Sequence, residues 1–501
     1  MPARSVDGED AMGIEGVERR SGQPQSDRVW TIETHGIDPI PEEDRHGDPA
    51  ELFWIWCAAN ISILGMTYGG FLVVFYGLSL WQGILAAAVG TLVSFLLVGF
   101  VSLAGKLGNA PTLVLSRASF GIVGNALPTF VSYISLVGWE TILVALSAFA
   151  AQTVLERLGW LHGDAALAVS FAIIAGATIA IGLLGHATIV RVQTWFTWAF
   201  AALTVIFMAL VWSDIAWDEV SNLPSTSLAG FLGGMSIVMA GLGIGWVNAG
   251  ADYSRYLPRS ANSRRVVFWT TFGGSIAPVI LIVFGVLVAA GTPDIATSTN
   301  PIGVLAEPLP TWFLVPYMIV AVGGLVAGAV LDIYSSGLNL LTLGLKIPRY
   351  QSVAIDGVLM LIGNIYILFV APDFFGPFQG FLITLGVLLA AWSAVFLADM
   401  WLYRRRAGYD EHQLYSSAGR YGAVNLAGVT SFLVAAVIGL GLVESTAAVF
   451  SWTGYLLDLV GGESGTVATS SIGLLIAFAV AGLLYPLLAP RLAPERRAAA
   501  R

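Results

Sequence analysis

Two acidic residues lie deep inside apolar stretches of the sequence, where ionised groups are rare. Glu140 stands at the centre of the stretch 126–154, and Asp332 lies about one turn past the centre of the stretch 311–345. A charged carboxylate at the middle of a membrane-spanning helix costs about 2.5–3.5 kcal/mol, and no basic residue is expected at the same depth. Each acid is therefore a candidate for proton coupling or for pairing with a cationic ligand. The alternative is a neutral carboxyl that bonds to a neighbouring backbone group.

Glycines interrupt two apolar stretches, and polar or aromatic side chains lie beside both interruptions. Glycine weakens a helix by about 1 kcal/mol per residue, and an interrupted helix at membrane depth persists only where it lines a cavity or is buried in protein. Paired interrupted helices mark the substrate site of many transporters. The open alternative is that the glycines let neighbouring helices pack closely. The residues concerned are Asn60, Ser62, Gly65, Gly69 and Gly70 in the first stretch, and Gly241, Gly243, Gly245, Trp246, Asn248 and Gly250 in the second.

Several polar side chains near these interruptions could hydrogen-bond to a ligand. They are Asn60, Ser62, Thr67, Ser132, Ser135, Glu140, Thr141 and Asn248. Among them we favour Asn60, Glu140 and Asn248. Asp252 lies beside Arg255 at the expected membrane edge, so a salt bridge or a loop anchor explains it better than transport does.

The composition predicts an all-α polytopic membrane protein. Of the 501 residues, 56% are hydrophobic and only 11% are charged, against about 25% charged residues in soluble domains. Cys57 is the only cysteine, which excludes a disulfide within the chain and a cysteine-based metal site. Residues 1–49 are polar and contain no apolar core of signal-peptide length, so we expect a disordered cytoplasmic tail.

Twelve windows are long and apolar enough to span a bilayer as helices. Their limits are about 52–77, 82–105, 126–154, 166–187, 192–213, 229–250, 266–290, 311–345, 353–371, 374–397, 423–446 and 468–489. The first, third and eighth are longer than needed, which predicts tilt or a break.

The basic residues predict the orientation. With the N-terminal tail inside, Arg157 is the only one of the 23 lysines and arginines expected outside, so both ends are predicted to be cytoplasmic. The loop 401–422 and the tail 490–501 then lie inside as well. We expect the plasma membrane as the location.

Twelve helices allow two six-helix halves, or two inverted five-helix halves with two helices left over. The interruptions in the first and sixth helices favour the second plan. It predicts a transport core over 50–400, with inverted repeats at about 50–213 and 229–397, followed by two further helices over 423–489.

Four motifs resemble the purine-cytosine permeases, a branch of the nucleobase:cation symporter-1 family. They are Gly36-Ile-Asp-Pro-Ile-Pro-Glu-Glu-Asp-Arg45, Leu113-Val-Leu-Ser-Arg-Ala-Ser-Phe-Gly121, Gly138-Trp139, and Gly245-Trp-Val-Asn-Ala-Gly-Ala-Asp-Tyr-Ser-Arg-Tyr-Leu-Pro258. The resemblance covers about residues 36–410. It implies the leucine-transporter-type fold, alternating access and a planar nitrogen heterocycle as the substrate.

The resemblance also implies roles for individual residues. Trp139 matches the substrate-stacking tryptophan, and aromatic stacking is worth about 1–3 kcal/mol per base in other settings. Trp246 could form the opposing wall. Alignment on Ala251-Asp252, however, places Gly243 at the family's second aromatic position.

The sequence departs from the family where the ligand edge is read. Leu136 and Leu143 replace the glutamine and asparagine that cytosine carriers have near the tryptophan, and Gly328 and Ala329 replace paired asparagines. Lost hydrogen-bond partners would leave ligand groups unsatisfied, so the ligand is read by other groups or is not cytosine. In sodium-coupled relatives, hydroxyl ligands also correspond to Gly328 and Ala329. Proton symport, with Glu140 and Asp332 as coupling residues, is therefore preferred over Na⁺ symport, which stays possible.

The predicted function is thus import of a nucleobase or related heterocycle by cation symport. A same-fold carrier of a thiamine-like cation, a hydantoin or allantoin, or an amino acid is the alternative. Enzyme motifs are missing, no cofactor or metal is expected, and there is no basic domain for nucleic acid. The expected partners are a small-molecule substrate and the lipid bilayer.

Overall fold

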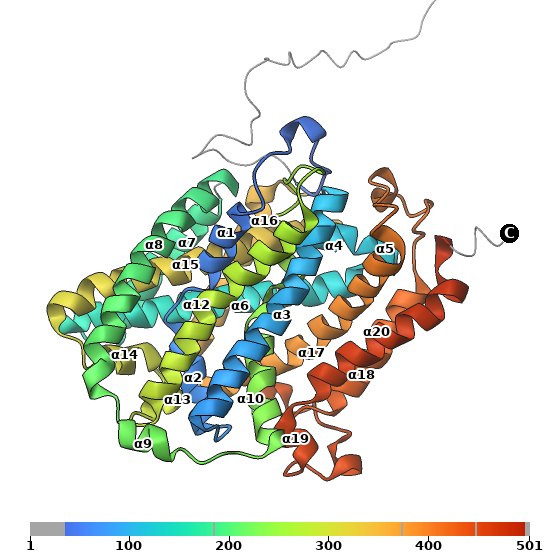
Figure 1. The fold of residues 1–501 in the computed structure, drawn as a ribbon. Coiled ribbons are helices and arrows are strands. Elements are labelled where there is room, and N and C mark those ends of the chain that lie inside the picture. Colours follow the sequence, from blue (N-terminus) through green and yellow to red (C-terminus); the bar gives the residue numbers. More distant parts are fainter. Residues whose placement is uncertain (1–35, 184–185, 372–373, 446–447, 496–501) are drawn as a thin grey trace, which may run out of the picture.

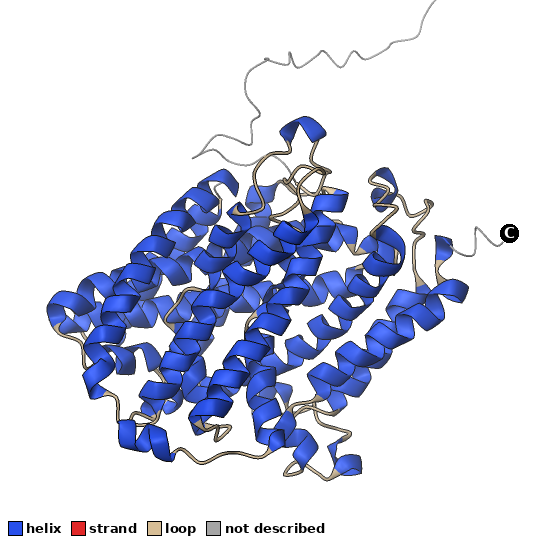
Figure 2. Cartoon of the chain, in the orientation of Figure 1, coloured by secondary structure: helices blue, strands red, loops and turns tan. Residues whose placement is uncertain are grey.

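The computed structural model describes residues 36–183, 186–371, 374–445 and 448–495, and these residues form helices joined by loops (Figures 1 and 2). No strand occurs within these ranges. The predicted disorder of residues 1–35 lies outside the described part of the chain.

The long helices fall where the twelve apolar windows predict them. Ten in the described part are long and apolar enough to cross a membrane, and a bent pair forms an eleventh candidate span. A shorter apolar helix lies in the eleventh window. The elements in chain order are α1 Glu51–Asn60 with α2 Leu64–Val74 as the bent pair, α3 Leu80–Gly108, α6 Ala126–Arg157, α7 Gly163–Gly182, α8 His186–Val211, α10 Leu228–Gly241, α12 Ser263–Ala289, α15 Thr311–Thr342, α16 Arg349–Phe369, α17 Phe375–Asp399, the shorter α18 Leu426–Gly441, and α20 Gly473–Leu492.

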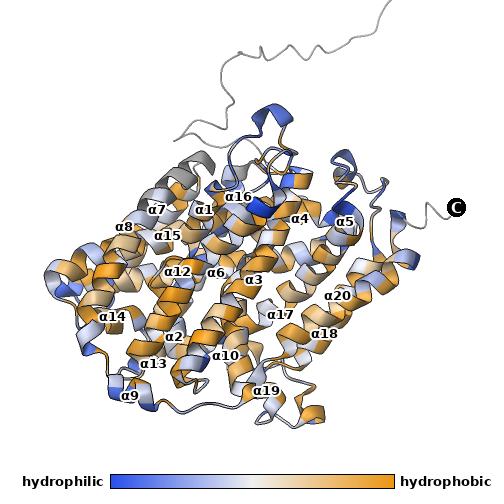
Figure 3. Ribbon diagram, in the orientation of Figure 1, coloured by the Kyte–Doolittle hydropathy of each residue, from blue (hydrophilic) through white to orange (hydrophobic). Residues whose placement is uncertain are grey.

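Short helices cap the two ends of the bundle. They are α4 Thr112–Leu115, α5 Arg117–Phe120, α9 Trp217–Asn222, α13 Asp294–Thr297, α14 Pro301–Ala306 and α19 Thr466–Ser470. A further short helix, α11 Gly243–Trp246, follows α10 within the sixth span. Hydrophilic residues gather at both ends, and hydrophobic residues dominate the belt between them (Figure 3). Large apolar side chains such as Leu92, Ile280 and Val437 are about half exposed on the outside of this belt, as expected of surfaces that face lipid. The chain is a multi-pass membrane protein.

Helices five places apart in the predicted order pack against each other. The second and seventh helices, α3 and α12, lie side by side, and so do the third and eighth, α6 and α15 (Figure 1). Two inverted repeats bring equivalent helices together in this way. Glycine makes the first of these contacts close: a Cβ added at Gly99 of α3 would lie 3.0 Å from the Val267 carbonyl oxygen of α12.

Both predicted interruptions break the helical geometry, and the first alone among the described spans bends its span by more than 40°. The axes of α1 and α2 differ by 56° across residues 61–63. In the sixth span, α10 ends at Gly241, and Leu242 leaves helical geometry with φ −117° and ψ −106° before α11 begins. The other two long windows, α6 and α15, are unbroken helices of 32 residues each.

Residues 36–49 correct the prediction of a disordered tail over 1–49, because they pack against one end of the bundle. Ile40 is fully buried, and its backbone exchanges hydrogen bonds with Asn109. The Arg45 guanidinium donates to the carbonyls of Leu257 and Lys106 at 2.9 and 2.6 Å. Composition alone missed this segment because its arginine is held by backbone carbonyls at the end of α3 and in the loop after the sixth span. We call this end, at the top of Figure 1, the basic end.

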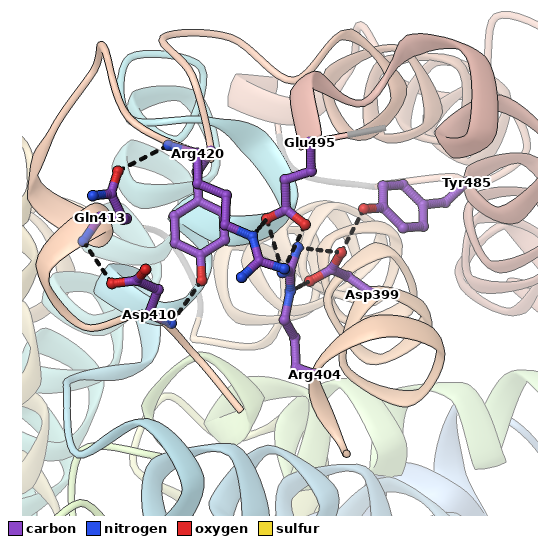
Figure 4. Close-up of polar contacts among 8 residues, drawn as sticks. Asp399, Arg404, Asp410, Gln413, Arg420, Tyr485 and Glu495 are labelled. Carbon is purple, nitrogen blue, oxygen red and sulfur yellow. Dashed lines mark hydrogen bonds and ion pairs between the residues drawn. The ribbon is translucent and has the colours of Figure 1, made fainter. Parts of the chain in front are cut away.

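A second polar cluster at the basic end joins α17 to the chain that follows α20 (Figure 4). Arg404 donates from Nε to Asp399 at 2.9 Å and from NH1 to Glu495 at 2.8 Å. The Tyr485 hydroxyl donates to the same aspartate at 2.7 Å. The side chains of Arg404 and Asp399 are 3% and 1% exposed, so this ion pair is screened little by water.

We expect Arg404→Ala to lower the thermal unfolding midpoint of the detergent-purified protein strongly. Removing one partner of a buried ion pair costs about 3–5 kcal/mol because the other charge stays buried and unpaired. Arg265→Ala is the matched control. Its pair with Asp48 is half exposed on both sides, and such pairs contribute about 0–1 kcal/mol. Equal shifts in the two variants would contradict the assigned role of the cluster.

Candidate substrate site

Trp139 lies beside the broken sixth span. Its indole meets the rings of Phe378 and Phe381 on α17 edge-on, with centroids 6.0 Å apart in each pair. A Cβ added at Gly245 of α11 would lie 3.0 Å from Trp139 Nε1. The tryptophan therefore packs between α11 and α17, and glycine at position 245 leaves room for its ring.

Trp246 belongs to a second aromatic group that includes the first span. It meets Trp56 of α1 edge-on at 5.7 Å, and Trp56 in turn contacts Tyr253 at 5.5 Å. The two broken spans thus contact each other through their tryptophans.

The glycines of the sixth span divide between the two roles considered from the sequence. Gly241, Gly243 and Gly250 allow close packing: added Cβ atoms would meet Tyr68 of α2 and, in α3, the backbone of Ser94 and Val98. The Gly243 amide also donates to Ser94 Oγ at 3.2 Å. Gly243 therefore faces α3, whereas Gly245 faces Trp139.

Side chains at the breaks keep some accessible surface although they lie deep in the sequence of each span. Asn60, Ser62 and Trp246 are each 7% exposed, and Trp139 is 8% exposed. Met66 and Val247, which flank them along the chain, are fully buried.

Hydrogen bonds hold the side chain of Asn248 through its amide nitrogen and not through its oxygen. Its amide nitrogen donates to Ser132 Oγ of α6 at 2.7 Å, and Asn339 of α15 donates to the same oxygen at 2.6 Å. The Asn248 side-chain oxygen is buried without a partner. Asn60 uses its amide nitrogen as a donor to the Trp56 carbonyl at 2.8 Å, at the point where α1 ends.

Asp252 anchors the loop after the sixth span, one of the two roles considered for it. Its Oδ1 accepts hydrogen bonds from the Thr112 backbone amide at 2.8 Å and from the Thr112 hydroxyl at 2.7 Å. Burial raises the pKa of this carboxyl, and the hydrogen bonds from Thr112 oppose that rise. The neighbouring Arg255 is fully buried and donates to the Gly36 carbonyl at 3.0 Å.

Glu140 points away from the aromatic group. It is fully buried, and its Oε1 accepts a hydrogen bond of 2.8 Å from Ser336 of α15, while Oε2 has no partner. Asp332, one turn before Ser336, is 1% exposed, and both of its carboxyl oxygens are without a hydrogen-bond partner. The predicted pair of deep acids thus lies on the α15 side of α6, whereas Trp139 lies on the α11 and α17 side.

α15 also carries two glycines that face the first break. Added Cβ atoms at Gly324 and Gly328 would lie 3.3 Å from the Ile61 carbonyl oxygen and 3.6 Å from the Ala59 carbonyl oxygen. The carbonyls at the end of α1 therefore face positions of α15 that have no side-chain oxygen.

Sequence reasoning missed several residues that the fold brings to this region. Asp356 of α16 shares Ser336 with Glu140, and its signal was an acid inside the window 353–371. Phe378 and Phe381 carry no such signal, because apolar aromatic residues in a membrane helix usually face lipid or core. Ser132 was a candidate, but its bond to Asn339 depends on the pairing of α6 with α15.

The fold and the broken spans define a class: membrane transporters of the leucine-transporter type. Over 93% of this chain and 99% of the other, the structure superposes with a TM-score of 0.70 on Mhp1, described as a nucleobase-cation-symport-1 family transporter in a closed conformation with bromovinylhydantoin bound, at 17% identity. Inward-facing Mhp1 gives a TM-score of 0.66 over 93% of this chain and 98% of that chain, also at 17% identity. The predicted fold is confirmed.

Residues 39–460 match the family described as permeases for cytosine/purines, uracil, thiamine and allantoin, and the chain belongs to that family. It is 27% identical to the putative purine-cytosine permease YxlA of Bacillus subtilis, over 92% of this chain and 97% of the relative. It is 25% identical to the purine-cytosine permease FCY21 of Saccharomyces cerevisiae, over 91% and 86%. The resemblance inferred from the motifs and the prediction of a nucleobase transporter are confirmed at this level.

Proposed function

We propose that this permease imports a planar nucleobase or a related nitrogen heterocycle together with protons, and that the ligand stacks on Trp139 between the two broken spans. The observation that carries the proposal is the position of Trp139. It is an aromatic ring, 8% exposed, backed by Phe378 and Phe381 and lying against the glycine of a broken helix. A flat heterocycle gains stacking energy there whatever its edge pattern.

The ligand edge would be read by groups that have unused hydrogen-bonding capacity. The Asn248 side-chain oxygen has no partner, and Asn60 and Ser62 lie at the break of the first span. A buried acceptor without a partner costs about 1–3 kcal/mol, which a ligand N–H would recover. Trp246 belongs to the same region. Gly243 packs against α3 and would support the site without contacting the ligand.

An uptake panel in a host that lacks its own nucleobase carriers tests the ligand and the stacking ring together. We expect cytosine or a purine to be taken up and to compete better than thiamine, allantoin, hydantoins or amino acids. Trp139→Ala should abolish this uptake without lowering the amount of protein in the membrane. The control is Trp160→Ala, since that side chain is 70% exposed outside the site. Normal uptake by Trp139→Ala would refute the stacking role.

Proton coupling is favoured by the chemistry of α15. A sodium ion prefers hard oxygen ligands, yet Gly328 presents none to the carbonyl of Ala59. Asp332, one turn later, is a buried carboxyl with both oxygens unpartnered. An isolated buried carboxylate is so costly that it takes up a proton instead. Asp332 is therefore proposed to hold a coupling proton, as is Glu140.

The coupling ion can be identified by measuring accumulation at fixed pH with and without Na⁺, and then across a pH gradient without Na⁺. We expect accumulation to ignore Na⁺ and to follow the pH gradient. Asp332→Asn should lose the accumulation, because an amide cannot release a proton, whereas the exposed Asp458→Asn should keep it. Strict dependence of the unmodified protein on Na⁺ would reverse the assignment.

The basic end is proposed to face the cytoplasm of a plasma-membrane carrier, because basic residues concentrate on that side of membrane proteins. The segment 36–49, the loop after α17 and the chain after α20 all lie at that end.

Cysteines introduced at exposed positions test this orientation, since the native Cys57 is buried. A membrane-impermeant thiol reagent should label Ser213→Cys in intact cells, and Arg406→Cys only after permeabilisation. The two positions are both exposed and lie at opposite ends of the bundle. The reverse labelling pattern would show that the orientation is wrong.

A further inference from the structure

A chain of three buried side chains joins Glu140 of α6 to Asp356 of α16. Ser336 of α15 lies between them, with its Oγ 2.8 Å from Glu140 Oε1 and 3.0 Å from Asp356 Oδ2. All three side chains are fully buried. The cluster therefore joins three spans through hydrogen bonds that are shielded from water.

The number of hydrogens available in this cluster favours an extra proton. The Ser336 hydroxyl has a single hydrogen, and an ionised carboxylate can only accept. If Ser336 donates to one carboxyl, its contact with the other is a hydrogen bond only when that second carboxyl is protonated and donates to Oγ. Ser336 Oγ also lies 3.1 Å from the Ile333 carbonyl, which competes for the same hydrogen. If both carboxyls were ionised, one of them would face a lone pair of Ser336 Oγ with no hydrogen between the two oxygens.

The surroundings also disfavour two ionised acids. The Tyr133 hydroxyl donates to Asp356 Oδ1 at 2.7 Å, and α15 carries a third buried acid, Asp332, one turn before Ser336. Within the described ranges, hydrogen bonds to Glu140 and Asp356 come from hydroxyl groups, and no lysine, arginine or histidine donates to either carboxyl. Like charges at such short range favour protonation of one partner.

We propose that Glu140 and Asp356 share one proton, which passes between them through the hydroxyl of Ser336. In the transfer, the O–H bond of Asp356 breaks as its proton goes to Ser336 Oγ, and the Ser336 hydrogen goes to Glu140 Oε1. The reverse transfer is equivalent, no electron changes hands, and the cluster keeps one proton throughout. This is a proton-binding site formed by α6, α15 and α16, and its use in coupling rests on the proposed function.

The cluster also offers a route toward the basic end. Asp356 and Tyr133 each lie seven residues after the first residue of their helices, α16 and α6. That distance is roughly 10 Å at 1.5 Å per residue. Both helices begin at the basic end. Arg117, shortly before α6, donates there to the carbonyl of Thr342, which ends α15 shortly before α16 begins. A proton on Glu140 is therefore connected by hydrogen bonds to a group closer to that end.

Infrared spectra of the detergent-purified protein test the shared proton without any transport. We expect a protonated-carboxyl band at neutral pH that loses the intensity of one carboxyl in Asp356→Asn and also in Glu140→Gln. In either variant the remaining carboxylate accepts from Ser336 and needs no proton. Ser147→Ala is the matched control, because its hydroxyl is equally buried on α6 and bonds only to the Leu143 carbonyl. A band that keeps its full intensity in either of these two single variants would overturn the proposal.

Transport in proteoliposomes tests whether the shared proton is the coupling proton. Ser336→Ala removes the bridge with little change in volume. It should keep counterflow exchange of labelled substrate but lose accumulation driven by a pH gradient, while Ser147→Ala keeps both. Unimpaired accumulation by Ser336→Ala would overturn the relay. Accumulation by the unmodified protein that needs Na⁺ and ignores pH would overturn the proposed proton coupling alone, since the infrared band reports the proton independently.

Discussion

The structure depends on burying the backbone of two broken helices inside a bundle surrounded by lipid. A helix that stops in the middle of a membrane leaves amides and carbonyls without partners, and no water is present to satisfy them. The neighbouring helices approach these breaks closely. Ser94 of α3 accepts from the amide of Gly243, and α15 packs against the carbonyl of Ala59 at Gly328, which has no side chain to donate to it. Glycine on one side of each contact is what permits that approach.

The spans could be predicted from the sequence better than the site could, because the site depends on how distant helices pack. Apolar windows and basic loops predicted the twelve spans, and the glycines marked both breaks, because bilayer thickness and backbone hydrogen bonding constrain each stretch locally. The glycines could not be divided by role from sequence, since Gly243 and Gly245 are two residues apart yet face α3 and Trp139 respectively. The packing of other helices around α11 decides which of these glycines contacts α3 and which contacts Trp139.

Contacts between distant segments were the other part that sequence reasoning could not reach. Phe378 and Phe381 support Trp139 from more than 200 residues away, and nothing in their own stretch distinguishes them from lipid-facing residues. Residues 36–49 look like a soluble tail because their composition is polar. Their order comes from the burial of Ile40 and from Arg45, which donates to the carbonyls of Lys106 in α3 and of Leu257 in the loop after the sixth span. Such matches exist only after the bundle has formed.

The arrangement of α6 gives a physical reason for substrate and proton to influence each other. Consecutive residues of a helix point about 100° apart, so Trp139 and Glu140 face different neighbours: α11 and α17 on one side, α15 and α16 on the other. A ligand can shift a conformational equilibrium only by its difference in affinity between the two states, and the same holds for a proton. Because both proposed sites share one continuous helix of 32 residues, a displacement of α6 that alters the ring contacts of Trp139 also alters the Ser336 contact of Glu140. Coupling then requires no long chain of intermediates, only a helix rigid enough to move as one body.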